Sequence, residues 1–150
     1  MVRIKNRYTV FEIIYPNRKP QDSNINERAC YKAISEAVSQ AYGDFGLGIL
    51  QNNLHVRYMS DWKDVILVKS RRGAHKLLQT AVTVFLKKIN DLDVSCRTLH
   101  IGGSIKACQR FLIKHYRNQL PSLMLKCSNL NEMKSIQEVI ISMCTNLNNS

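Results

Sequence analysis

Apolar residues along this chain recur with a period of two in some segments and a period near 3.6 in others, and the order of these segments strongly constrains the fold. Residues 2–14 alternate apolar and polar side chains, as a half-buried strand does. From Cys30 to Ala41, apolar residues recur three and four positions apart, which is typical of an amphipathic helix. Gly43 suits the C-terminus of that helix. The chain is therefore predicted to begin with a strand and then a helix.

The remaining segments continue this alternation. Two strands, a helix, a strand and two further helices are predicted over residues 49–59, 62–70, 73–90, 95–101, 104–118 and 132–143. The first two strands form a hairpin around Ser60 and Asp61. The order β-α-β-β-α-β predicts an α+β fold, a ferredoxin-like, RNA-recognition-like split βαβ sandwich with two additional C-terminal helices. We expect one domain over residues 1–145 and a flexible tail at 146–150.

The charge balance indicates an anionic partner. Lys and Arg number 22 against 11 Asp and Glu, and the formal net charge is +11. A positive field of this size favours nucleic acid or an anionic membrane surface. No apolar run is long enough to span a bilayer, and MVRIKNRYTV at the start has no signal-peptide core, so we expect a soluble protein inside the cell. Five cysteines without a CxxC pair are expected to be reduced thiols.

Cations gather in two segments before the last third of the chain. Arg3, Lys5 and Arg7 are predicted to share one face of the first strand, because side chains alternate in a strand. KSRRGAHK, at residues 69–76, groups Lys and Arg with His75 at a junction of strand and helix. Either group alone could be an ordinary solvated surface, but together they favour contacts with nucleic-acid phosphates.

A third basic group lies on the helix predicted from Ser104. At 100° per residue, four cations fall within one arc of about 80°, and they are Lys106, Arg110, Lys114 and Arg117. The apolar residues Ile105, Cys108, Leu112 and Tyr116 lie on the opposite side. No carboxylate interrupts the stripe, whereas an ordinary exposed helix mixes charges of both signs. A helix that contacts phosphates is the favoured interpretation, and a solvated outer face is the alternative.

Gly102 and Gly103 stand between the predicted strand and this helix. They match neither the dinucleotide-binding fingerprint nor the P-loop, which require other glycine spacings. We interpret the pair as a sharp turn, with Ser104 as the N-cap of the helix. Backbone amides at such a turn can also bind phosphate, so all three residues belong to the predicted binding set.

Residues that could catalyse a reaction or hold a metal are sparse. Asp61 with Asp64, and Asp91 with Asp93, fall in predicted turns where Asp is favoured by backbone hydrogen bonding. We therefore predict no catalytic residue, no metal ligand and no cofactor bound by the protein itself. The alternative is a stand-alone RNA-cleaving enzyme that uses His100 and His115 as general acid and base.

Three motifs carry a resemblance to a known family. MVRIKNRY at 1–8, VRY at 56–58 and TLHIGGSIKACQRFLIKH at 98–115 together resemble the small Pop-type αβ protein subunit of eukaryotic ribonuclease P and ribonuclease MRP. The last motif is the most specific, because it joins TLH, a glycine pair and a CQ in the following helix. The resemblance extends over about residues 1–145.

The resemblance implies a noncatalytic subunit of a ribonucleoprotein endoribonuclease in the nucleus and nucleolus. In ribonuclease P a large structured RNA, with magnesium, removes the 5′ leader of precursor tRNA, and ribonuclease MRP acts in ribosomal RNA processing. The subunit would brace the RNA through phosphate contacts and dock other protein subunits, a barrel-type subunit among them, with no membrane partner.

Contacts to phosphates and to RNA shape are expected, because the sequence lacks the RNP1 run whose aromatic residues stack on bases. The predicted RNA-binding set joins the three basic groups, the glycine turn and the arginine of VRY. It comprises Arg3, Lys5, Arg7, Arg57, Lys69, Arg71, Arg72, Lys76, Gly102, Gly103, Ser104, Lys106, Arg110, Lys114 and Arg117.

Overall fold

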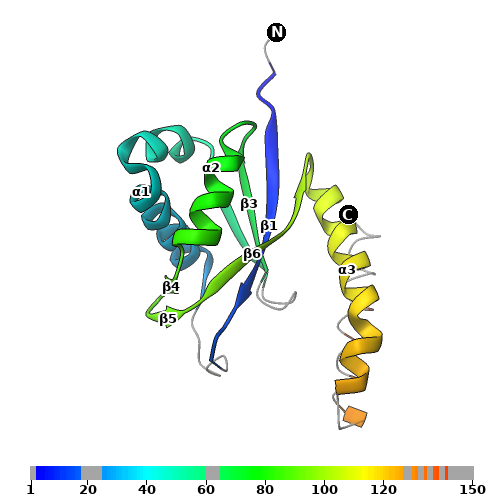
Figure 1. Ribbon diagram of the computed structural model, residues 1–150. Helices are drawn as coiled ribbons and strands as arrows, with labels where there is room; N and C mark the ends of the chain where they lie inside the picture. The colour runs from blue at the N-terminus through cyan, green and yellow to red at the C-terminus, as the bar shows by residue number, and fades with distance from the viewer. Residues whose placement is uncertain are drawn as a thin grey trace. The chain divides into compact units, whose positions relative to one another are not determined.

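The structure is a computed structural model that describes residues 3–17, 25–59 and 65–126, together with residues 130, 131, 134, 137, 138 and 141. The chain divides into two compact units, Met1–Ser104 and Ile105–Ser150 (Figure 1). The predicted turn at Ser60 and Asp61, Asp64 and the predicted tail lie outside the described residues.

A four-stranded antiparallel sheet forms the centre of the first unit. Its strands lie in the order β2-β3-β1-β6, with β1 at Asn6–Ile14, β2 at His55–Met59, β3 at Val65–Arg71 and β6 at Ser95–Gly102. Because β1 and β2 both pair antiparallel with β3, they run in the same direction with β3 between them. This is the split βαβ arrangement, and the predicted ferredoxin-like order of elements is confirmed.

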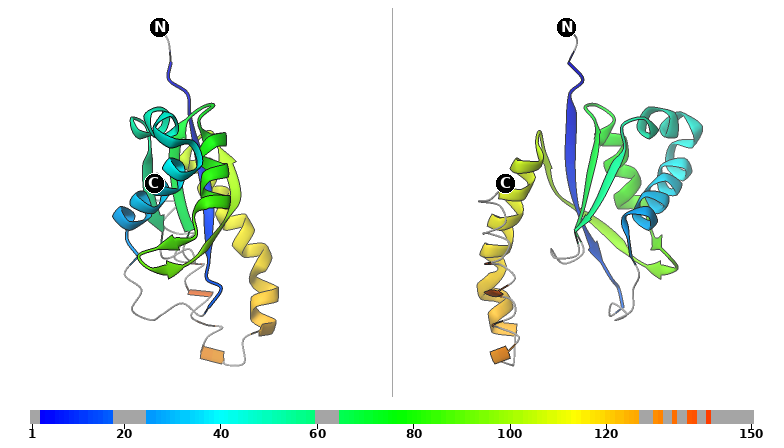
Figure 2. Two further views of the ribbon diagram at one scale, coloured as in Figure 1. Left: turned by 60° about the vertical axis from the view of Figure 1, so that its left-hand side comes forward. Right: turned by 180° about the vertical axis from the view of Figure 1, so that it is seen from behind.

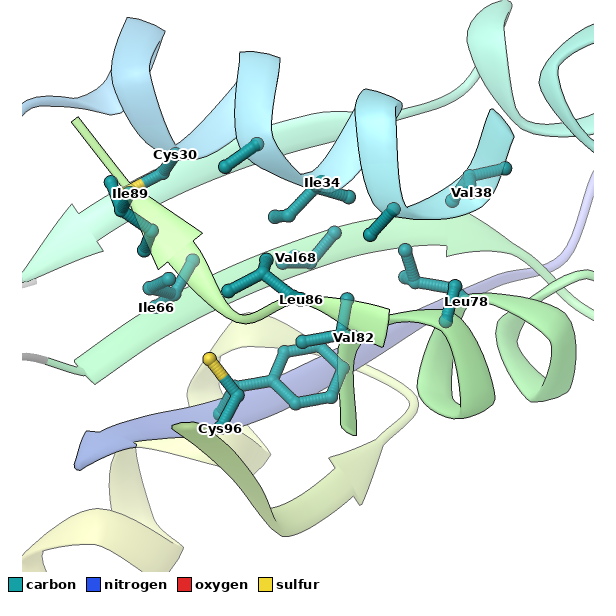
Figure 3. Packing of buried hydrophobic residues seen from close by; sticks show 14 of the residues in the cluster. Cys30, Ile34, Val38, Ile66, Val68, Leu78, Val82, Leu86, Ile89 and Cys96 are labelled. Carbon is teal, nitrogen blue, oxygen red and sulfur yellow. The ribbon is translucent and has the colours of Figure 1, made fainter. Parts of the chain in front are cut away.

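Helices cover one face of this sheet (Figures 1 and 2). They are α1 (Glu27–Gln51) and α2 (His75–Thr80), and α2 continues as a π-helical turn, η2 (Ala81–Phe85). The Asn26 side chain caps α1 by accepting a hydrogen bond from Ala29 N at 2.8 Å. Figure 3 shows the core between the layers, where Ile66 and Val68 of β3 lie among Ile34, Val38, Leu78 and Val82 of the helices.

Strand register determines which side chains enter this core. Thr9 pairs with Val68 and Phe11 with Ile66, so the odd-numbered residues of β1 share the face covered by α1 and α2. The even-numbered residues, including Tyr8 and Val10, lie on the second face. A bulge between Val10 and Phe11 interrupts the pairing of β1 with β6.

The first helix is longer than predicted. Gly43 adopts φ 63° and ψ −153° inside α1, and the helix resumes beyond this kink to Gln51. Residues 49–51 are therefore helical, and the prediction that a strand begins at Ile49 was wrong. Leu50 in the resumed helix is 2% exposed and Leu54 after it is 7% exposed, and both pack into the main core. Glycine marked the break in the helix axis but not the end of the helix.

The second helical segment is shorter than predicted. It ends at Phe85, and Lys88–Ile89 (β4) pairs with Leu92–Asp93 (β5) as a small hairpin. Asn90 and Asp91 form its two-residue turn with φ 46° and 63°, a conformation that Asn and Asp tolerate better than most residues. Asp91 therefore lies in a turn as predicted, and Asp93 forms a 3.8 Å ion pair with Lys88.

The second unit contains α3, Ile105–Lys126, which extends beyond the predicted end at residue 118 and includes Pro121. The helix predicted over 132–143 lies mostly outside the described residues, and those described within it are helical. Across the described part of the chain, no helix combines the length and apolarity needed to span a membrane.

Candidate nucleic-acid interface

The first two basic groups lie together at one end of the sheet. Asn6 and Arg7, at the start of β1, pair with Arg71 and Ser70 at the end of β3. Beyond the sheet, Arg72 N donates a 2.8 Å hydrogen bond to the carbonyl oxygen of Lys5. The antiparallel register therefore joins the N-terminal segment to KSRRGAHK, two segments far apart in the sequence.

The glycine turn reaches the same end. Gly102, the last residue of β6, pairs with Tyr8. A Cβ atom added to Gly103 would lie 3.6 Å from Arg7 Nη1, so the guanidinium group lies beside this glycine. Arg7 Nη1 also donates a 3.3 Å hydrogen bond to the carbonyl oxygen of Asn6. The structure thus brings residues from β1, β3, the turn into α2 and β6 into one region.

The glycine pair lies at the end of a strand, as predicted, but neither residue has a positive φ. Among the described glycines, a positive φ is found at Gly43 and at Gly73, and Gly73 has φ 99° in the turn between β3 and α2. At Gly103 the 3.6 Å separation is ordinary van der Waals contact, so a small side chain would fit. The predicted turn is present as a bend at residues 103 and 104, between β6 and α3, but neither the backbone φ nor the space at Gly103 requires glycine there. Ser104 is the residue immediately before α3.

His75 lies within this basic region. Its Nδ1 atom accepts a 3.1 Å hydrogen bond from the backbone N–H of Gly73. Partial burial lowers the pKa of His75 from its ordinary value, and the neighbouring charges of Arg7, Lys76 and Arg72 lower it further. We name Lys5, Arg7, Arg72, His75 and Lys76 the end cluster.

Sequence reasoning selected four residues of the end cluster but not His75. The position of His75 in KSRRGAHK, with Arg72 before it and Lys76 after it, is the sequence feature that could have identified it. Lys5, Arg72 and Lys76 are exposed, whereas Arg7 is half-buried.

Other predicted residues lie on the second face of the sheet. Arg57 pairs with Leu67, Lys69 pairs with both His55 and Tyr8, and Arg71 pairs with Asn6, so the three cations share this face. Arg57 and Arg71 are exposed, and Lys69 is half-buried. Glu12 on the same face is occupied by an ion pair with Arg97.

The expected alignment of Arg3, Lys5 and Arg7 along one strand face was wrong. β1 begins at Asn6, so Arg3 and Lys5 precede the sheet and only Arg7 belongs to the strand. Arg7 pairs with Ser70 on the face covered by the helices. A period of two places side chains on one face only while the backbone remains a paired strand.

The third basic group lies on α3. Lys106, Arg110, Lys114 and Arg117 are all exposed, whereas Cys108, Leu112 and Tyr116 are between 1% and 4% exposed. The predicted division of this helix into a basic and a buried side is confirmed at these residues. Ile105 is the exception, with 37% exposure at the first turn of the helix.

The two histidines considered for catalysis lie in different units. His100 belongs to β6 in the first unit and pairs with Val10. His115 in α3 stacks on Phe111 with ring centroids 5.6 Å apart, and its Nε2 lies 3.0 Å from Gln119 Nε2. Within the described residues, no three His, Cys, Asp or Glu side chains are grouped as a metal site would need.

Comparison with known proteins identifies a family that matches this chain and a solved structure with a similar fold. Residues 7–113 match the model of the Rpp14/Pop5 family. The chain is 28% identical over 147 residues to "Ribonuclease P/MRP protein subunit POP5" of Homo sapiens. The aligned region covers 96% of this chain and 90% of the human protein. The protein of the same name from Danio rerio is 31% identical over 154 residues, covering 98% of this chain and 89% of the fish protein.

A fungal relative matches in sequence, and a chain of a solved structure is similar in fold. The same subunit of Schizosaccharomyces pombe is 29% identical over 133 residues, covering 83% of this chain and 95% of the yeast protein. A chain in the cryo-EM structure of yeast ribonuclease MRP is similar in fold, with a TM-score of 0.53 and 11% identity. That match covers 69% of this chain and 78% of the other.

Proposed function

Because the chain belongs to the Rpp14/Pop5 family, we propose that it is a noncatalytic protein subunit of ribonuclease P and ribonuclease MRP. In this role it braces the large structured RNA through phosphate contacts and docks other protein subunits. The observation that carries the RNA-binding part is the convergence of cations from sequence-distant segments in the end cluster. Clustered cations without intervening carboxylates are suited to phosphates, which supply most of the affinity of such interfaces.

The reaction of such a complex belongs to its RNA. In ribonuclease P the RNA, with bound magnesium, removes the 5′ leader of precursor tRNA, and in ribonuclease MRP the complex processes ribosomal RNA. The protein contributes positive charge and shape, binds no cofactor of its own and meets precursor tRNA through the assembled complex. We place this activity in the nucleus, including the nucleolus.

The helical side of the first unit supports the docking of other proteins, including a barrel-type subunit. On α1, Tyr31 and Ile49 are each 36% exposed and Phe45 is 73% exposed. A mainly apolar groove of about 240 Å³ lies beside Tyr31 and is also lined by Val38, Leu47, Leu50 and Leu54. α1 carries Glu27, Glu36 and Asp44 against Arg28 and Lys32, so this helix lacks the net positive charge of the end cluster. Such a surface suits a protein better than an RNA phosphate.

Affinity purification of the tagged chain from cells, followed by sequencing of the bound RNA, tests the proposal. We expect a large structured RNA of the ribonuclease P or MRP type to dominate. A second arm incubates the pure protein with precursor tRNA and magnesium, where we expect no cleavage until the large RNA is added. Absence of that RNA from the purified material would contradict subunit membership, and cleavage at the mature 5′ end by protein alone would contradict the noncatalytic role.

A further inference from the structure

We propose that Arg7, Arg72, His75 and Lys76 form a single phosphate-binding site in which His75 takes up a proton as the phosphate binds. The inference rests on the proposed RNA-binding function and adds a residue and a pH dependence to it. Three elements supply the site: β1 holds Arg7, the turn after β3 holds Arg72, and α2 begins at His75 and Lys76.

Backbone pairing between distant segments holds these groups in one region. Register pairing fixes Arg7 opposite Ser70, and the hydrogen bond from Arg72 N to Lys5 O ties the turn to the N-terminal segment. The charges that act on the His75 ring are those of Arg7, Lys76 and Arg72, with no acidic side chain of the described residues among them. The free site therefore concentrates positive charge that a bound phosphate would partly neutralise.

The hydrogen bond from Gly73 to His75 defines which ring nitrogen takes up the proton. Nδ1 accepts the N–H of Gly73 at 3.1 Å, so the proton of the neutral ring lies on Nε2. The incoming proton must therefore enter at Nδ1, and the bond from Gly73 must break. Afterwards the imidazolium Nδ1–H and the released Gly73 N–H are both donors, and a phosphate oxygen accepts from either.

The sign of the coupling follows from the charges. Without a ligand, burial and three cations disfavour the imidazolium, so the pKa of His75 lies below 6.5. A phosphate adds negative charge beside the ring and raises that pKa. Between the free and the bound pKa values, binding takes up as much as one proton, and affinity increases as the pH falls by up to about tenfold per pH unit.

Nuclear magnetic resonance of the histidine-labelled whole chain tests the site. The His75 ring signals are followed from pH 5 to pH 8 in three samples at equal ionic strength: protein alone, protein saturated with a short RNA duplex, and protein with inorganic phosphate. We expect the midpoint of His75 to move upward with RNA, while the other histidines serve as internal references. A rise with inorganic phosphate as well supports a general phosphate site, whereas a rise with inorganic phosphate but not with RNA would overturn the inference.

His75→Gln is the matched variant, because glutamine keeps an acceptor for the Gly73 N–H but cannot be protonated. We expect the RNA affinity of the wild type to rise between pH 8 and pH 5.5, and we expect His75→Gln to lack this rise. An unchanged His75 midpoint in RNA-saturated protein would overturn this inference while leaving salt-dependent RNA binding intact. Complete absence of RNA binding would overturn both this inference and the proposed function.

Discussion

At the residue scale, the position of a side chain decides its chemistry, as Cys96 and Cys30 illustrate. Cys30 belongs to α1 and Cys96 to β6, and both side chains lie in the core, as Figure 3 shows. Burial, with a smaller effect from Cys30, raises the pKa of Cys96 to about 12. The nucleophilic thiolate is therefore almost absent at neutral pH.

We expect Cys96 to resist alkylation by iodoacetamide at pH 8 in the folded protein and to react readily in denaturant. Mass spectrometry of peptides taken at increasing times would measure both rates, with the denatured chain as the control. Rapid labelling of Cys96 under native conditions would contradict its placement in the core.

His75 predicts a pH dependence of folding in the absence of RNA. Its folded pKa is lowered from 6.5, so the unfolded chain binds more protons between the folded pKa and 6.5. The contribution of His75 to stability is therefore fully present above pH 6.5 and is lost as the pH falls through the folded pKa.

Thermal unfolding of the RNA-free protein between pH 8 and pH 5 measures this effect. We expect the wild-type Tm to fall below pH 6.5 and the fall to be smaller in His75→Gln. Identical profiles of Tm against pH for the two proteins would show that the charges around His75 do not disfavour its protonation.

At the element scale, α3 separates two roles on opposite sides of one helix. Leu112 is 1% exposed, whereas Lys106 and Arg110 are exposed. The sequence alone predicted this division, because helical periodicity is a local property. The same local pattern did not predict that α1 continues past Gly43, since the resumed turn is stabilised by Leu50 packing into a core built from distant strands.

We expect Leu112→Ala to destabilise the fold by about 2–5 kcal/mol, because it leaves a cavity where a buried side chain stood. RNA affinity per folded molecule should change little. The double change Lys106→Ala and Arg110→Ala should leave Tm nearly unchanged or raise it, since like charges are removed and alanine favours helices.

Measurements of RNA affinity distinguish the phosphate-binding side of α3 from its buried side. In the double variant we expect weaker binding and a salt slope lower by roughly 1–2 units, one for each lost phosphate contact. Chemical denaturation and RNA titration at several salt concentrations provide the two measurements. Unchanged affinity in a folded double variant would show that this face of α3 is solvated or contacts a protein.

At the scale of the whole molecule, the chain carries a net charge of +11 and gathers many of its cations on particular surfaces. The end cluster, the second sheet face and the exposed side of α3 hold at least eleven of the 22 Lys and Arg residues, whereas α1 carries more acidic than basic residues together with exposed apolar residues. This distribution favours RNA contacts through the first three surfaces and protein contacts through α1.

If about six phosphate contacts form, the fall of log K with log salt should have a slope of about 4–5. Titration of the purified protein with RNA at several salt concentrations measures it. The triple change Arg7→Gln, Arg72→Gln and Lys76→Gln should lower the slope by about two to three units.

A matched control removes three exposed cations elsewhere, with Arg28→Gln, Lys32→Gln and Lys87→Gln, and should leave the slope nearly unchanged. Both triple variants lose the same formal charge. An equal loss of slope in the two would indicate that net charge, rather than the end cluster, governs binding. A slope near 1 in the wild type would mean that most cations do not contact phosphate.

The sequence by itself determined the order of strands and helices, the basic and buried sides of α3, and the family resemblance, because periodicity and motifs are properties of neighbouring residues. Only the tertiary structure decided that Arg7 lies beside Gly103 with its charge acting on His75, and that the predicted end of a helix at residues 88–90 belongs to a hairpin over 88–93. The antiparallel pairing of β1 with β3 and β6 brings these segments together. Such contacts arise when distant segments bury a common core, and no local period encodes them.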